Sequence, residues 1–471
     1  MTVTGTTNES PEQGHREDDQ IAARYVVGID LGTTNSAVCY VDTTDQNWQI
    51  RTFAVPQLVA PGLVEARETL PSFHYEPHAN ELKPAQIRLP FGNQKPGYVV
   101  GVYARDFGGK VTGRLVASAK SWLCHSGVDR TSKLLPWQAA DDVTQISPVD
   151  VTARYLSHIR AAWDHVFPQH QLAAQDVVVT LPASFDEVAR ELTVRAAKAA
   201  DIPKIVLLEE PQAAFYAWVY EHADDWQTLL QPGQKILVCD IGGGTTDLTL
   251  IRVCAAAEDD CAAAEETRAE SDGTVRFHRV VVGEHLILGG DNLDLALAHH
   301  LEMRLVGQGQ IAANLWGQLV RIACDVKEKL LADDAPERMT VSIPGIGSKL
   351  IGGAKQIEVT RDEIEQLLVD GFMPFVPLNA KPSRHQSGVR EFGLPYATDH
   401  AITRYLAQFL TTHCHAGSVT NAERELDSPI PDIVLLNGGM FEAAKMRRRL
   451  FEQLSAWSAE LDAAKNQVVR E

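Results

Sequence analysis

The sequence has no apolar run of the roughly 18–20 residues that a membrane-spanning helix needs, and residues 1–20 carry no hydrophobic stretch behind a basic start. We therefore expect no membrane contact and no secretion by an ordinary signal peptide. The seven cysteines include no C-x-x-C pair, and several lie in apolar runs, as Cys239 does. This usage predicts reduced thiols in a cytoplasmic protein.

An excess of basic residues is also lacking. The chain holds 43 Lys and Arg against 62 Asp and Glu, a formal charge of −19, so its overall field does not favour nucleic acid or anionic lipid. With 45% hydrophobic and 22% charged residues, the composition is that of an ordinary folded protein. At about 150 residues per domain, the length of 471 residues predicts several compact units or one large two-lobed unit.

The common phosphate and zinc motifs are missing as well. Gly109-Lys110, the one Gly-Lys pair, is followed by Val111, so there is no G-x-x-x-x-G-K-[ST] loop. Gly345 and Gly347 lack the third glycine of a dinucleotide-binding turn, and no H-E-x-x-H occurs. These absences disfavour a P-loop NTPase, a Rossmann enzyme and a zinc protease.

The remaining pattern alternates strands and helices, which predicts an α/β fold. We expect strands at 177–181 and 205–208, a helix opened by a capping box at Ser184, and further helix starts at Pro211 and Thr360. Three other segments are typical of irregular structure, namely a disordered tail at 1–20, an acidic insertion at 253–274 and a loop at 374–395.

An internal repeat is the most informative feature. Residues 26–38 read V-V-G-I-D-L-G-T-T-N-S-A-V, and residues 236–248 read I-L-V-C-D-I-G-G-G-T-T-D-L. Each copy has an apolar strand that ends in an aspartate, a glycine turn with adjacent threonines, and a second strand. Glycines let backbone N–H groups approach an anion, threonine hydroxyls add donors, and a carboxylate can hold Mg²⁺ through its water shell. The repeat predicts two hairpins that clamp a polyphosphate; the alternative is a pair of purely structural tight turns.

These two turns resemble the phosphate loops of the heat shock protein 70 (DnaK-like) chaperones, within the actin, sugar-kinase and chaperone ATPase superfamily. Four further segments resemble motifs of that family in the same order, at 177–185, 209–214, 288–294 and 433–439. The resemblance spans roughly residues 25–450. It implies a duplicated ribonuclease-H-like fold, with ATPase lobe I at 21–234 and ATPase lobe II at 235–471 around a nucleotide cleft.

The resemblance also implies site residues. Mg²⁺ would be held through water by Asp30, Asp240 and Asp247, and the catalytic group would be Lys120, Thr245, Asp240 and Asp30. Glu210 and Pro182 would link the site to the setting of the lobes. The nucleotide, ATP or ADP, would be bound by Gly32, Thr33, Thr34, Asn35, Gly242, Gly243, Gly244, Thr245, Gly289, Gly290, Asp325, Lys329, Gly438, Gly439 and Met440. K⁺ is an additional candidate cation.

The sequence departs from the family in three places. After the adenosine-loop glycines the family usually has Ser-Thr-Arg, but this chain has Met440, Phe441 and Glu442, which leaves the adenine contact open. On the facing helix a one-residue ambiguity makes Lys327 an alternative to Lys329. The sequence stops about where the family's returning helix begins, so we expect the peptide-binding domain to be absent from it. A client protein, co-chaperone or exchange factor would then engage through that missing C-terminal part.

The function expected from these residues is hydrolysis of ATP to ADP and phosphate, slow and regulated by a partner, coupled to rotation of the lobes. Two alternatives use the same residues. One is a non-catalytic, nucleotide-gated interaction module, and the other is a kinase or phosphatase of the same actin-like fold.

Overall fold

The computed structural model describes residues 23–468 apart from 79–80, 92–96, 112, 138, 256–274, 308–309, 344–354, 384–393, 395 and 417–426. The predicted tail at 1–20 lies outside the described residues, as does most of the predicted acidic insertion at 253–274. The described part of 374–395 forms neither helix nor strand, as predicted.

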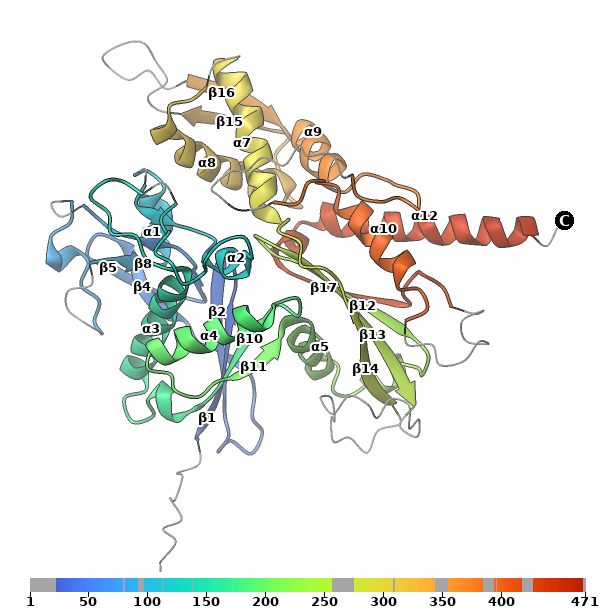
Figure 1. Cartoon of the computed structure of the whole chain (residues 1–471), viewed down its shortest axis with the longest axis horizontal. Helices are drawn as coiled ribbons and strands as arrows, with labels where there is room; N and C mark the ends of the chain where they lie inside the picture. Colours follow the sequence, from blue (N-terminus) through green and yellow to red (C-terminus); the bar gives the residue numbers. More distant parts are fainter. Residues whose placement is uncertain are drawn as a thin grey trace, which may run out of the picture.

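The first half of the chain, residues 23–234, is built on a sheet with the strand order β11-β10-β1-β2-β3, to which β6 adds beside β2 (Figure 1). β1 runs antiparallel to β2 and parallel to β10. Val27 and Ile29 of β1 are fully buried in one core with Leu156 of the long helix α3. The strands are β1 (Tyr25–Leu31), β2 (Asn35–Asp42), β3 (Arg51–Thr52), β6 (Thr69–Pro71), β10 (Asp176–Leu181) and β11 (Val206–Glu209), and the helices beside them are α2 (Ala119–Cys124), α3 (Pro148–Val166) and α4 (Glu187–Ala199).

The second half, residues 235–468, is built on a sheet with the order β14-β13-β12-β17. β12 runs antiparallel to β13 and parallel to β17. Both halves therefore contain a hairpin whose first strand also has a parallel neighbour. The elements of this half are β12 (Lys235–Ile241), β13 (Thr246–Ala255), β14 (Val275–Val282), β17 (Ile433–Asn437), α10 (Ile402–Thr412) and α12 (Ala444–Val468).

Smaller groups of strands and helices extend from each half, and α5 connects the two sheets (Figure 1). Phe215 of α5 packs with Ile236 and Val253 of the second sheet, although α5 directly follows β11 of the first. The remaining elements are β4 (Val55–Ala60), β5 (Leu63–Arg67), β7 (His74–Tyr75), β8 (Val99–Val100), α1 (Val102–Gly108), β9 (Leu115–Val116), α5 (Glu210–Glu221), α6 (Trp226–Leu229), α7 (Gly290–Val306), α8 (Ala313–Leu331), β15 (Arg338–Ile343), β16 (Lys355–Thr360) and α9 (Arg361–Ile364).

Most of the predicted element boundaries are confirmed. Pro211 lies in the first turn of α5, and the Thr360 side chain accepts a hydrogen bond from the Glu363 amide at the start of α9. The predicted cap at Ser184 is wrong by two residues. Asp186 caps α4 instead and accepts from the Ala189 amide at 2.8 Å, because the Ser184 hydroxyl is bonded to Asp247.

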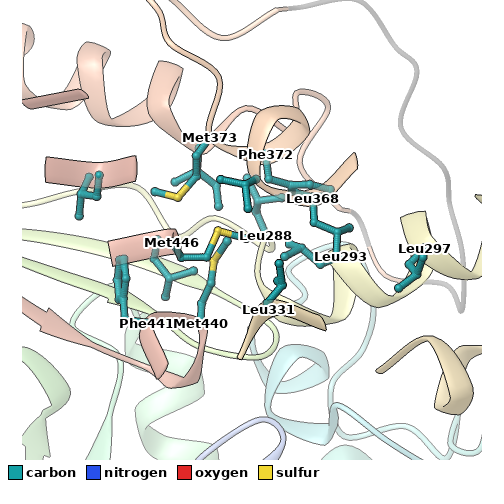
Figure 2. Close-up of a cluster of buried hydrophobic side chains, with 14 of the residues drawn as sticks. Leu288, Leu293, Leu297, Leu331, Leu368, Phe372, Met373, Met440, Phe441 and Met446 are labelled. Carbon is teal, nitrogen blue, oxygen red and sulfur yellow. The ribbon is translucent and has the colours of Figure 1, made fainter. Parts of the chain in front are cut away.

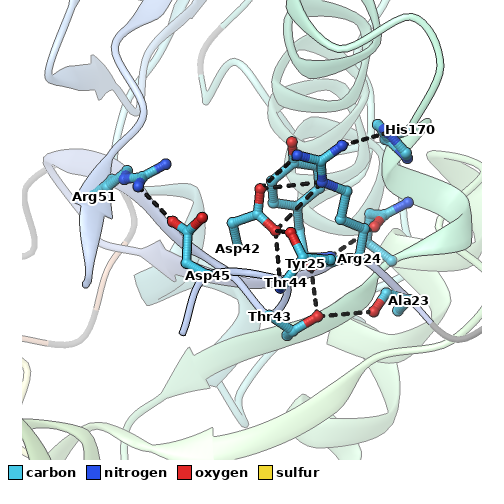
Figure 3. Close-up of polar contacts among 10 residues, drawn as sticks. Ala23, Arg24, Tyr25, Asp42, Thr43, Thr44, Asp45, Arg51 and His170 are labelled. Atoms are coloured by element: carbon cyan, nitrogen blue, oxygen red, sulfur yellow. Dashed lines mark hydrogen bonds and ion pairs between the residues drawn. The ribbon is translucent and has the colours of Figure 1, made fainter. Parts of the chain in front are cut away.

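Polar contacts at the open end of the first hairpin join β1 to β2 (Figure 3). The Arg24 guanidinium donates to Asp42 at 2.8 Å and lies 3.3 Å from a ring nitrogen of His170. The hydrogen bond from Arg24, followed by that from Thr44, lowers the pKa of Asp42 below its ordinary value. These contacts hold the hairpin at the end that is remote from its glycine turn.

The thiols depart from the prediction at one position. Cys254, at the end of β13, is disulfide-bonded, so the expectation of reduced thiols is wrong there. The free thiols of the described part are Cys39, Cys124, Cys239, Cys324 and Cys414. None of the described helices is long and apolar enough to cross a membrane, and a cytoplasmic location stays a prediction.

Candidate active site

The two repeated aspartates occupy equivalent positions in the two sheets. Asp30 pairs in register with Thr180 of the parallel neighbour β10, and the Thr180 hydroxyl donates to the Asp30 carboxylate at 2.8 Å. Asp240 pairs with Asn437 of the parallel neighbour β17, and the Asn437 amide donates to the Asp240 carboxylate at 2.8 Å. Each half therefore orients its strand-end carboxylate with a hydrogen bond from the neighbouring strand.

The two glycine turns lie against each other. A Cβ added at Gly243 would overlap the Thr34 hydroxyl, and one at Gly244 would approach Thr33 Cγ2 to 2.6 Å and Ser121 Oγ to 2.8 Å. Only glycine allows this approach. The hydroxyls of Thr34 and Ser121 are buried without a hydrogen-bond partner, which is costly unless an acceptor is supplied. An anion between the turns would satisfy them.

The glycine pair at 289–290 supports the second turn. The Gly290 amide donates to the Gly242 carbonyl at 3.0 Å, and the Asp291 amide donates to the Gly243 carbonyl at 2.7 Å. A Cβ at Gly289 would come within 2.6 Å of the Gly242 carbonyl oxygen. The first turn of α7 is thereby tied to the turn that carries the repeated glycines.

Lys120 lies among carboxylates beside these turns. Its ammonium forms an ion pair with Glu210, and both side chains are almost completely buried, at 12% and 13% exposed. Burial by itself would lower the pKa of Lys120, but Glu210, Asp30 and Asp240 together raise the pKa above its ordinary value. These carboxylates therefore favour the charged form of the buried Lys120 side chain.

Two buried carboxylates hold their protons more tightly than free aspartate. Burial and, to a smaller extent, the charge of Asp247 raise the pKa of Asp240 to about 6. Burial and the neighbouring Asp294 raise the pKa of Asp291 to about 6, and the Ser118 hydroxyl donates to Asp291 across the two halves at 2.9 Å. A cation at Asp240 would relieve this electrostatic penalty.

Comparison with known proteins shows which proteins this chain is similar to. The family model described as Hsp70 protein matches residues 103–268. Over these residues the chain is similar to the Hsp70 family. The chaperone protein HscA of Enterobacter sp. (strain 638) is 28% identical over 360 residues, which are 73% of this chain and 46% of that protein. The HscA of Salmonella agona (strain SL483) is 27% identical over 357 residues with the same coverage.

The match therefore spans about half the length of these curated relatives. Within that span the similarity is to Hsp70-like chaperones, which does not favour the interaction-module or kinase alternatives. The mixed α/β architecture is consistent with this relationship.

Met440, which we expected to contact a nucleotide, lies elsewhere in the structure. The side chain of Met440 is only 8% exposed and packs with Leu288, Leu293 and Met446 in the core of the second half (Figure 2). It is therefore committed to the core and is not a free platform for adenine. Gly438 has a φ of +90°, which favours glycine, and an added Cβ there would lie 2.8 Å from the Asp240 carboxylate.

The helix that was expected to contact the nucleoside places a different lysine near the turns. Asp325 pairs with Arg321 on its own helix at 2.9 Å, and Lys329 is exposed. Lys327 instead reaches the Gly290 carbonyl at 3.3 Å and pairs with Asp294 at 2.7 Å. Helix geometry explains the correction, because residues two positions apart point about 200° away from each other.

The other predicted residues lie at or next to the turns. Thr33 and Thr245 are buried there, and Asn35 begins β2 exposed. An added Cβ at Gly32 would clash with the Asn35 carbonyl. Pro182 is buried directly after β10, on the same loop as Ser184.

Sequence reasoning missed the residues that orient the site from a distance. Thr180 and Asn437 lie in the segments 177–185 and 433–439, which resemble family motifs. Knowledge of the strand pairing would have placed them beside Asp30 and Asp240. Ser118 and His285 carried no local signal, and the local signal at Ser184 indicated a helix cap and not a site role, since the partners of all three lie far away in the sequence.

Proposed function

We propose that this chain binds Mg·ATP between its two glycine turns and hydrolyses it to ADP and phosphate. The observation that supports this proposal best is the buried charge pattern. Lys120 forms an ion pair with Glu210 and is influenced by Asp30 and Asp240, beside two turns where the hydroxyls of Thr34 and Ser121 are buried without a hydrogen-bond partner. The two sheets, with their equivalent hairpins, would be the halves of a duplicated ribonuclease-H-like fold, lobe I at 21–234 and lobe II at 235–471. Because the turns touch, nucleotide entry requires the lobes to separate.

The carboxylates suit a magnesium ion held through its water shell. Among the described residues, no three acidic, histidine or cysteine side chains lie close enough to ligate one ion directly. Asp30, Asp240 and Asp247 would therefore hold the hydrated ion, which supplies charge neutralisation on the phosphate oxygens when bound. K⁺ is the additional candidate cation.

The chain's own residues would supply positioning and charge. Gly243, Gly244 and the threonines of both turns would donate to the phosphates, and Lys120 with Thr245 would orient the attacking water. Glu210 and Pro182 would relay lobe position to this site. Lys327 replaces Lys329 as the proposed nucleoside-side lysine, with the backbone of Gly438 and Gly439 opposite.

The biological setting is proposed from the relatives. Both reported relatives are named as chaperones, so we propose that this chain is the ATPase part of an Hsp70-like chaperone. Client protein, co-chaperone and exchange factor would be the partners, engaged through a further C-terminal part.

Single-turnover hydrolysis of ATP tests the proposal. Asp240→Asn and Lys120→Ala should each lower the rate about 100- to 1000-fold, because each removes one buried charge from the site. Asp325→Asn, on an exposed pair, is the matched control and should hydrolyse like the wild type. Rates of the two site variants within threefold of the wild type, or a wild type that binds ATP without releasing phosphate, would contradict the ATPase proposal.

A further inference from the structure

Three polar side chains from distant segments meet at Asp247. Ser184 belongs to the loop between β10 and α4, Asp247 to β13, and His285 to the segment between β14 and α7. The Ser184 hydroxyl contacts the Asp247 carboxylate oxygen Oδ1 and lies 2.6 Å from His285 Nδ1. The Asp247 side chain is 3% exposed and that of His285 is 15% exposed.

The protons in this cluster can be assigned by counting donors. Two oxygens in such close contact need a proton between them, and the carboxylate has none, so the Ser184 hydroxyl must donate to Asp247. The serine has then no second proton to give, and the 2.6 Å contact requires His285 Nδ1–H to donate to Ser184. His285 Nδ1 also lies 3.4 Å from the same Asp247 oxygen. The result is a directed chain of hydrogen bonds from His285 through Ser184 to Asp247.

This arrangement differs from a hydrolase triad. A nucleophilic serine needs the histidine nitrogen opposite the one that faces the aspartate. Here both Ser184 and Asp247 face Nδ1, while Nε2 is buried without a partner. The cluster therefore cannot pass a proton from serine to histidine to a leaving group, and its effect is to fix the carboxylate.

The chain of hydrogen bonds also crosses between the halves. Ser184 comes from the first half, whereas Asp247 and His285 come from the second. A rotation of one half against the other would withdraw the serine and release the carboxylate oxygen. Asp247 is thus held in one orientation only while the halves are together.

We propose that Ser184 and His285 are positioning residues that orient Asp247 for the hydrated metal ion and make this orientation depend on lobe closure. The inference rests on the proposed function, since Asp247 is one of the three carboxylates assigned to Mg²⁺. Hydrogen-bond partners of metal-holding carboxylates set metal affinity, and losing one typically weakens it 10- to 100-fold. Neither residue would touch the nucleotide.

Calorimetric titration of ADP into the full chain, at a series of Mg²⁺ concentrations and in EDTA, tests this role. Ser184→Ala and His285→Leu should raise the Mg²⁺ concentration that half-maximally enhances ADP binding by about tenfold. Affinity in EDTA should match the wild type. Ser184→Thr and His285→Asn keep a donor in the same place and should retain wild-type Mg²⁺ dependence. His300→Asn, which alters a histidine of α7 that is paired with Glu363 of α9, is the control.

The outcomes separate the inference from the function. A wild-type Mg²⁺ dependence in both Ser184→Ala and His285→Leu overturns the inference, and so does an equal loss of affinity with and without Mg²⁺, which indicates a general structural effect. A wild type that binds no ADP overturns the proposed function itself. If Ser184→Ala does not fold, Ser184→Cys repeats the test with a weak donor of similar shape. An unchanged Mg²⁺ dependence in both Ser184→Cys and His285→Leu then overturns the inference.

Discussion

Replacing Asp291 by asparagine should stabilise the nucleotide-free protein at neutral pH. The Asp291 carboxyl lies between the two halves, where it accepts a hydrogen bond from Ser118, and its pKa is raised from 3.8 to about 6 by burial and by Asp294. At about 1.4 kcal/mol for each tenfold change in proton affinity, this difference corresponds to about 3 kcal/mol. Asparagine has no charge to bury, and its side-chain oxygen can still accept the Ser118 hydrogen bond.

The direction of the pH dependence follows from linkage. Below pH 3.8 the carboxyl is protonated in both the folded and the unfolded chain, so it contributes no difference. As the pH rises, the unfolded chain releases its proton first, and the free energy of unfolding falls until the folded carboxyl ionises near pH 6. Asp291→Asn should therefore exceed the wild type by up to about 3 kcal/mol at pH 7.5 and match it near pH 4.

Urea denaturation followed by far-UV circular dichroism, without nucleotide or Mg²⁺, measures this difference. Asp325→Asn is the control, because Asp325 is 44% exposed and paired on its own helix. The reasoning is refuted if Asp291→Asn is no more stable than the wild type at pH 7.5, or if its advantage is the same at pH 4 and pH 7.5. Asp240, whose pKa is also about 6, leaves a residual pH dependence in both proteins.

Three further outcomes are expected. Gly244→Ala should separate the turns, since its Cβ would lie 2.6 Å from Thr33 Cγ2, and limited trypsin digestion should then be faster than for the wild type; equal rates would contradict the close packing. Met440→Ala should lower the free energy of unfolding by about 2–5 kcal/mol in urea denaturation, and a loss below 1 kcal/mol would place the side chain outside the core. Lys327→Ala should weaken ADP binding at least fivefold in calorimetry while Lys329→Ala leaves it unchanged, and the reverse order would restore the original assignment.

Sequence patterns predicted those parts of the site that depend only on residues close together in the chain. The two aspartate-glycine-threonine turns, the strand at 177–181 and the helix start at Pro211 follow from short patterns, because turn geometry and strand periodicity depend on neighbours in the sequence. The repeat even placed Asp30 and Asp240 at matching strand ends. Resemblance to a family added which residues would serve together, and it carried over Lys120 to the position beside the turns.

Tertiary structure alone decided which polar groups meet. Ser184 is 63 residues from Asp247 and 101 from His285, and Ser118 is 173 from Asp291. These pairs depend on how the two halves close, which no local period encodes. The same holds for Met440, which burial in the second core removes from the nucleoside side. The sequence by itself determined two glycine turns and their carboxylates, and packing of one half on the other determined how those carboxylates are oriented and charged.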